Sequence, residues 1–157
     1  MAIQRAVPRI GAFSLIELLI SMVILSILIG FAYPSYRQHV VKANRSDAHI
    51  AIQRIAMAQE RNYAILHRYS DNMASLGGTT SSEGYYTLAS FTGHSGSGIS
   101  DCGDVSSDTD ATGSYTIIAQ PVASKSQSSD ADCTCIYMDS RGVKGSTGAR
   151  AEAGDCW

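Results

Sequence analysis

Residues 11–36 constrain the fold of this chain more than any other stretch, because they form an almost uninterrupted apolar run. Residues 13–33 alone supply about 20 positions, the length that crosses the hydrocarbon core of a bilayer as a helix. The run contains one acid near its start, Glu17, and one proline near its end, Pro34. A carboxylate is costly within lipid and usually has a function there. The run therefore predicts a membrane-spanning helix with a functional acid near its N-terminal end.

The residues around this acid form a motif. The sequence GAFSLIEL, which begins at Gly11, resembles the cleavage and methylation motif of type IV prepilins. In that family a short basic leader is removed in front of a Phe, the new amine is methylated, and a Glu occupies the fifth mature position. The resemblance implies cleavage after Ala12, which makes Phe13 the first mature residue and Glu17 the fifth. Cleavage after Gly11 is the alternative, and it would make Glu17 the sixth mature residue. The family normally has Gly before the cut, whereas this chain has Ala12 there.

Glu17 and Pro34 receive roles from the same resemblance. A carboxylate in lipid takes up a proton or finds a cation. The resemblance implies that Glu17 pairs with the Phe13 amine of a neighbouring subunit during filament assembly. The alternative is a Glu that is tolerated near the membrane surface. Pro34 falls where the family also carries a proline, and it should kink the helix without ending it.

The chain is predicted to contain four segments: a leader peptide (1–12), a membrane and filament-core half of a helix (13–36), an amphipathic half (37–67) and a globular head (68–157). The leader contains Arg5 and Arg9 and no acid, which places the N-terminus in the cytoplasm and the head outside. The resemblance implies the bacterial inner membrane, with a periplasmic head, before assembly and an extracellular pilus afterwards. All four cysteines follow the helix, which suits an oxidising compartment.

The predicted fold class is α+β, and the resemblance implies the pilin fold. One helix should run from Phe13 to about Asn62. Beyond residue 36, apolar spacings of three and four predict a stripe that faces a sheet; its members are Ala48, Ile52, Ile55, Gln59, Tyr63 and Leu66. Patterning predicts strands at 85–91, 114–122 and 133–139 and a short return segment at 143–145. The helix should therefore pack on an antiparallel sheet of three to four strands, followed by an irregular tail from Ser146.

The four cysteines allow three disulfide pairings, and their spacing does not choose between them. Cys133 and Cys135 are two apart on a predicted strand, so both should point to one face. The stretch CTCIYMDSRGVKGSTG and the terminal DCW resemble the C-terminal region of PilE-like minor pilins. That resemblance implies a Cys133–Cys156 bridge that closes a C-terminal loop, and it leaves Cys102 with Cys135. A four-cysteine zinc site is the alternative, but the spacing is a poor zinc pattern.

No pattern in the sequence predicts catalysis, a cofactor or a metal. The Gly-rich residues 93–98 match neither a nucleophile elbow nor a phosphate-binding loop. The acids of the following loop lack the spacing of a calcium loop and are expected to be solvated; they are Asp101, Asp104, Asp108 and Asp110. The histidines His39, His49 and His67 are expected to be solvated as well. The protein is therefore predicted not to be an enzyme.

The resemblance to pilins implies a structural function in the type IV pilus. The expected partners are the prepilin peptidase, an inner-membrane assembly platform, and other major and minor pilins. The C-terminal resemblance favours a PilE-like minor pilin, which joins or primes the filament, over a major pilin. A type II secretion pseudopilin shares the N-terminal motif, but the cysteines and the terminal DCW argue against it.

A DNA-binding minor pilin for DNA uptake is a hypothesis of a different class, and it requires a basic surface on the head. From Ile65 onward the chain has five Lys and Arg residues against eleven Asp and Glu residues. An acidic head disfavours contact with phosphates, so DNA is not expected among the partners. Arg141, Lys144 and Arg150 are close enough in sequence to form a local basic patch near the C-terminal loop.

Overall fold

The computed structural model describes residues 13–93, 98–107, 113–150 and 153–157. It divides into two compact units, residues 1–39 and residues 40–157. The leader and the cleavage residues Gly11 and Ala12 lie outside the described residues, as do Asp108 and Asp110 of the acidic loop.

Helix α1 (Leu15–Leu66) supplies the described part of the first unit and continues into the second. Glu17 lies in its first turn and Pro34 lies inside it. Every large apolar side chain of its first half is exposed, from Leu15 to Tyr36. By length and composition, α1 contains a segment that could cross a membrane. Apolar side chains in this number need lipid or protein around them, as the sequence predicts.

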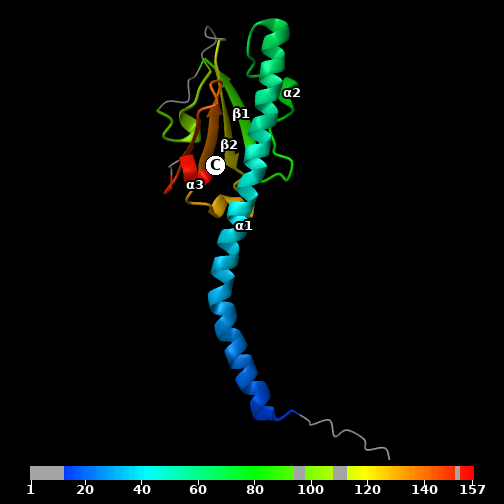
Figure 1. The fold of residues 1–157 in the computed structure, drawn as a ribbon, viewed down its shortest axis with the longest axis vertical. Helices are drawn as coiled ribbons and strands as arrows, with labels where there is room; N and C mark the ends of the chain where they lie inside the picture. Colours follow the sequence, from blue (N-terminus) through cyan, green and yellow to red (C-terminus); the bar gives the residue numbers. More distant parts are fainter. Residues whose placement is uncertain (1–12, 94–97, 108–112, 151–152) are drawn as a thin grey trace, which may run out of the picture. The chain divides into compact units, whose positions relative to one another are not determined.

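The second unit is built on a four-stranded antiparallel sheet, with strand order β1-β2-β3-β4. Its strands are β1 (Tyr86–Thr92), β2 (Tyr115–Pro121), β3 (Cys135–Asp139) and β4 (Lys144–Thr147). Figure 1 shows the second half of α1 lying across one face of this sheet. The predicted α+β class is therefore confirmed, and the short return segment is the fourth strand.

Within the described residues, three short helices lie in the connections of the second unit and a fourth lies at its C-terminal end. They are α2 (Met73–Leu76), η1 (Cys102–Asp104), η2 (Ser126–Ser129) and α3 (Ala153–Cys156). Helix α3 corrects the expectation of an irregular tail. The acids Asp101 and Asp104 form the capping box of η1, so they have a local structural role in the acidic loop.

The core between α1 and the sheet follows the predicted stripe only in part. Ala48, Ile52, Ile55 and Gln59 are fully buried against strand residues such as Tyr86, Leu88, Ile117 and Ile136. Tyr63 and Leu66 are 40% and 55% exposed, so the prediction was wrong for the last turn of the stripe. At this end the Tyr63 ring stacks on the ring of Tyr69, which lies between α1 and α2, instead of packing on a strand. The two ring centroids are 4.7 Å apart.

The opposite face of the sheet has a smaller core of its own, formed by Ile99, Cys102, Val105, Ile118 and Cys135. Cys135 points to this face, whereas Cys133 packs in the core on the helix side. The prediction that both cysteines share one face was wrong because β3 begins only at Cys135. The strict alternation of a strand therefore does not extend back to Cys133.

Two disulfides join parts of the second unit that are distant in sequence. Cys102 pairs with Cys135, which attaches η1 to the outer face of the sheet. Cys133 pairs with Cys156, and this bridge closes the C-terminal loop, as the sequence analysis expected. These are the pairs that the resemblance to pilins implies.

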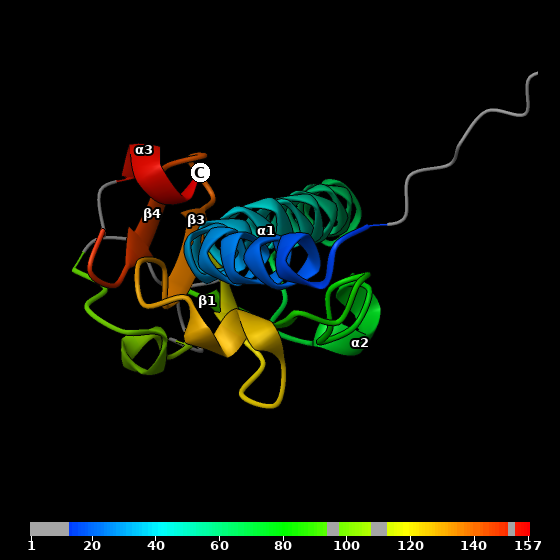
Figure 2. The ribbon, with the colours of Figure 1, turned by 90° about the horizontal axis from the view of Figure 1, so that it is seen from below.

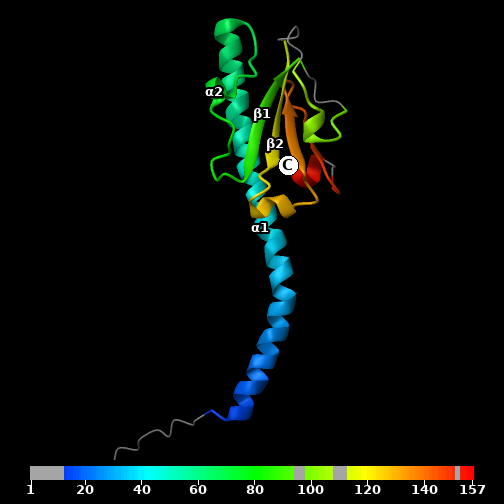
Figure 3. The same cartoon turned by 180° about the vertical axis from the view of Figure 1, so that it is seen from behind.

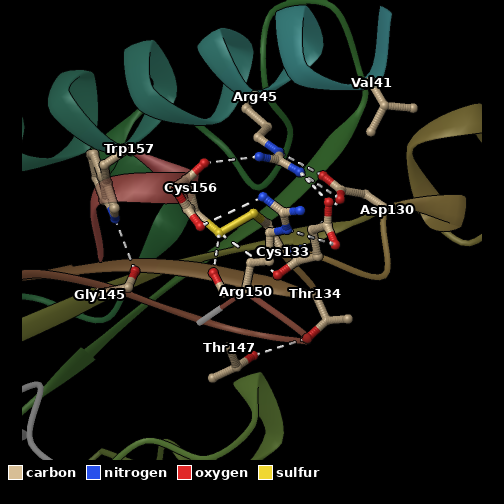
Figure 4. Close-up of a disulfide and its surroundings, with 12 residues drawn as sticks. Val41, Arg45, Asp130, Cys133, Thr134, Gly145, Thr147, Arg150, Cys156 and Trp157 are labelled. Atoms are coloured by element: carbon tan, nitrogen blue, oxygen red, sulfur yellow. Dashed lines mark hydrogen bonds and ion pairs between the residues drawn. A yellow bond between two sulfur atoms is a disulfide. The ribbon is translucent and has the colours of Figure 1, made fainter. Parts of the chain in front are cut away.

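The C-terminal end is fixed to α1 by polar and aromatic contacts around the second disulfide (Figure 4). The Arg45 guanidinium donates two hydrogen bonds of 2.8 Å to the Asp130 carboxylate and a third of 3.0 Å to the carbonyl of Asp155. The Trp157 ring stacks on His49 at 4.7 Å, and its Nε1 donates to the carbonyl of Gly145 at 2.9 Å. The last residues are therefore part of the folded unit.

Replacing His67 by glycine should stabilise the protein by about 0.5–1 kcal/mol. His67 follows the last residue of α1 and has a φ of 54°, in the left-handed region where a side chain is strained and glycine is not. Urea unfolding of the full chain in detergent measures the change. His67→Ala is the control, because it keeps the strain and removes only the ring; equal stability of both variants would contradict the prediction.

Candidate nucleic-acid interface

The predicted basic patch lies at the β3–β4 turn and the C-terminal loop, and acids occupy much of it. The Arg141 guanidinium binds the buried Asp139 carboxylate at 2.7 Å. Arg150 lies 3.9 Å from Asp132 and 4.0 Å from Asp155. The Lys144 ammonium lies 4.6 Å above the Trp157 ring. These contacts hold the C-terminal loop together, and they pair two of the three cations of the patch with acids.

A second basic surface lies on the other side of the head, between α1 and the segment that leads to β1. Arg54 and Arg61 are seven residues apart on α1, so they lie on the same face of the helix two turns apart. They line a pocket of about 550 Å³ with Ser75, Leu76 and Gly77. A second pocket beside it has a volume of about 370 Å³. The residues that line this second pocket are Asn62, Leu66, Arg68, Tyr69, Ser70, Asp71, Ser75 and Thr92. Because Ser75 lines both, we treat the two as one connection groove.

The arginines of the connection groove are less neutralised than those of the C-terminal patch. Arg61 and Arg68 are exposed, and within the described residues neither forms an ion pair. Arg54 donates from its Nη2 to the carbonyl of Thr80 at 3.2 Å, while its buried Nε has no partner among the described residues. The exposed guanidinium groups of Arg61 and Arg68 can donate to the oxygens of an anionic ligand.

The walls of the groove are held in place by Gln59, which is fully buried. Its side-chain oxygen accepts from the backbone N–H of Ser70 at 3.0 Å, and its amide donates to the carbonyl of Ser70 and to Ser90 Oγ of β1. The side chain thus pairs with the Ser70 backbone much as a neighbouring strand would. These hydrogen bonds of Gln59 fix the segment that carries Arg68 against the helix that carries Arg61.

A tyrosine cluster adjoins the groove through Tyr69, which lines the smaller pocket. The Tyr115 hydroxyl donates to Glu60 at 3.1 Å, and the Tyr69 hydroxyl donates to the same carboxylate at 3.3 Å. Burial raises the pKa of both phenols, and the nearby Glu60 carboxylate raises each pKa further. Both phenols are therefore neutral donors at physiological pH, and the Glu60 carboxylate accepts a hydrogen bond from each of them.

The two basic surfaces lie far apart on the head. Figure 2 shows α2 and α3 on opposite sides of the second unit, and Figure 3 shows the same arrangement from behind. Sequence reasoning did not identify the connection groove, because it counted the basic residues of the head only from Ile65 onward and so left out Arg54 and Arg61. The available signal was the seven-residue spacing of Arg54 and Arg61, which places both on one face of a helix.

Two family models together match residues 8–138 of the chain. Residues 8–33 match the family model of the prokaryotic N-terminal methylation motif. A type IV pilin structure from Shewanella oneidensis is 20% identical, with a TM-score of 0.47, over 74% of this chain and 97% of that one. The non-core minor pilin PilV of Neisseria meningitidis is 15% identical, with a TM-score of 0.48, over 73% and 94%. A search of curated proteins gave no significant match.

Residues 34–138, more than half of the chain, match the family model described as "Type IV minor pilin ComP, DNA uptake sequence receptor". The match confirms the prediction of a minor pilin and, with the methylation motif, of a pilus protein instead of an enzyme. It overturns the expectation that DNA is not a partner, because the family is described as a DNA receptor. The apolar helix and the methylation motif agree with a membrane-anchored pilin that is assembled into a pilus. The chain belongs to the type IV minor pilin family that is described as ComP.

Proposed function

We propose that this protein is a minor pilin that binds DNA at the cell surface for uptake. The observation that carries the proposal is the match of residues 34–138 to a family of DNA uptake sequence receptors. Cleavage after Ala12 would expose the Phe13 amine, and Glu17 would pair with that amine on a neighbouring subunit. Residues 13–36 would hold the protein in the inner membrane until it joins the pilus.

The connection groove is the surface that we assign to DNA. Arg54, Arg61 and Arg68 all lie inside the matched range, whereas Arg141, Lys144 and Arg150 lie beyond its last residue. The groove also keeps guanidinium donors that no described acid neutralises, whereas Arg141 and Arg150 are paired with acids. Backbone phosphates along the groove would accept from Arg54 and Arg61 and supply most of the affinity.

The acidity of the head does not conflict with this assignment. At physiological ionic strength a charge acts over a distance of about 8 Å, so acids on other faces have little effect in the groove. The acids Asp132, Asp139 and Asp155 are already in ion pairs with Arg45, Arg141 or Arg150. The sum of charges over the head was therefore a poor guide to local binding.

The double variant Arg61→Ala with Arg68→Ala should bind duplex DNA at least about tenfold more weakly, because two guanidinium contacts to the DNA are lost. The slope of log affinity against log salt should fall by about 1 in magnitude, for the phosphate contact of Arg61. The measurement is fluorescence anisotropy of a labelled duplex, titrated with the full mature chain in a nonionic detergent at several salt concentrations.

The matched control is Arg141→Ala with Arg150→Ala, which removes the same charge from the C-terminal patch. We expect it to change DNA affinity by less than about threefold, since both arginines are paired with acids. A larger loss in the control than in the groove variant would move the DNA site to the C-terminal patch. If the unaltered protein bound no duplex even at low salt, the proposed function itself would be wrong.

A further inference from the structure

We infer that the smaller pocket of the connection groove reads the edge of a DNA base and that Asp71 is a specificity-determining residue within it. The inference rests on the proposed function, because it assigns roles within the same DNA-binding groove. It divides the groove into a part that contacts phosphates, around Arg54 and Arg61, and a part that distinguishes one base sequence from another.

The chemistry of the smaller pocket does not suit a phosphate. Its lining combines the guanidinium of Arg68, the amide of Asn62, the carboxylate of Asp71 and the hydroxyls of Ser75 and Thr92. A backbone phosphate offers acceptors alone, and a carboxylate beside it costs binding energy through the repulsion of like charges. A carboxylate at a surface selected only for DNA affinity would therefore be a disadvantage.

The same chemistry suits a base edge, which presents donors as well as acceptors. A carboxylate accepts from the exocyclic amine of cytosine, an arginine donates to guanine O6 and N7, and an asparagine pairs with adenine. The lining of the pocket provides one side chain of each kind, in Asp71, Arg68 and Asn62. The larger pocket differs, because its described polar lining consists of Arg54, Arg61 and Ser75 and includes no carboxylate.

Asp71 is held between two fixed neighbours. Gln59 pairs with both backbone groups of Ser70, as described above, and Ser70 Oγ accepts from the N–H of Asn72 at 3.1 Å. Asn72 in turn caps α2, with its Oδ1 accepting from Ala74 N at 3.1 Å. The Asp71 carboxylate itself is exposed and accepts no hydrogen bond from the residues that the structure describes. A rigid backbone with a free acceptor is what a base-reading side chain needs.

The test compares Asp71→Asn with the unaltered full chain on a library of short duplexes randomised in sequence. The selected duplex and its single-base-pair variants are then titrated at one salt concentration. We expect Asp71→Asn to lose about tenfold discrimination at one base pair, since a good base contact is worth that much or more. The salt slope should not change. Arg61→Ala should show the opposite pattern, with a smaller salt slope and an unchanged order of sequence preference.

Two outcomes would overturn the inference. If Asp71→Asn bound every duplex more tightly by the same factor, Asp71 would only repel phosphates. If it changed neither preference nor affinity, Asp71 would lie outside the interface. Glu83→Gln removes an exposed acid outside the groove and controls for the change in net charge. Absence of DNA binding by the unaltered protein would instead contradict the proposed function, so the two failures are distinguishable.

Discussion

Replacing Arg45 by alanine should lower the free energy of unfolding of the head by about 3–5 kcal/mol, because it leaves a buried carboxylate without its counter-ion. The side chains of Arg45 and Asp130 are only 6% and 2% exposed. The pair is bidentate, and Asp130 also accepts from Gln127 and from the N–H of Cys133. The variant would therefore lose the ion pair that joins α1 to Asp130, which lies in the segment before β3. Urea unfolding, followed by the fluorescence of the single tryptophan, Trp157, measures the change.

The control for this prediction replaces both partners. Asp130→Ala alone should cost a similar amount, because a buried guanidinium would then be unpaired. The double variant Arg45→Met with Asp130→Leu removes both charges and should recover most of the loss, since well-packed apolar side chains often substitute for a buried ion pair. If each single variant cost less than about 1 kcal/mol, the pair would be solvated in solution and the prediction would be wrong.

Removing the disulfide between Cys133 and Cys156 by serine substitution at both positions should cost about 3 kcal/mol of stability. The bridge closes a loop with a sequence separation of 23, and the chain-entropy model assigns about this much to such a loop. The bridge also holds Trp157 near His49 and Gly145, so its loss should expose the indole to water. Urea unfolding gives the free energy, and a red shift of the tryptophan emission in the absence of urea reports the release of the C-terminal end.

The matched control is the double serine variant of Cys102 and Cys135, whose sequence separation is 33. The entropic cost should be similar, at about 4 kcal/mol. The emission of Trp157 should stay unchanged in the folded state, because this bridge attaches η1 to the other face of the sheet. A red shift in both variants, or in neither, would contradict the assignment of the Cys133–Cys156 bridge as the anchor of the C-terminal end.

The features that the sequence alone determined are those with local causes. The apolar run from residue 13 predicts its own helix, because its length and composition leave no other stable state in a bilayer. The strands follow from β-branched and aromatic residues bounded by Gly, Ser and Asp, and each lies within two residues of its predicted position. The GAFSLIEL motif is contiguous, so it could be recognised before any fold was known.

The features that only the tertiary structure decided join residues that are distant in sequence. Arg45 and Asp130 are separated by 85 positions, and no local pattern predicts that a helix arginine is buried there. Gln59 fits the buried stripe of α1, but its pairing with Ser70 depends on where the chain returns after His67. The connection groove likewise exists only because α2 folds back beside Arg54 and Arg61. Charge is summed along a sequence, whereas a ligand meets only the charges that the fold brings to one surface, and for this reason the sequence did not predict the connection groove.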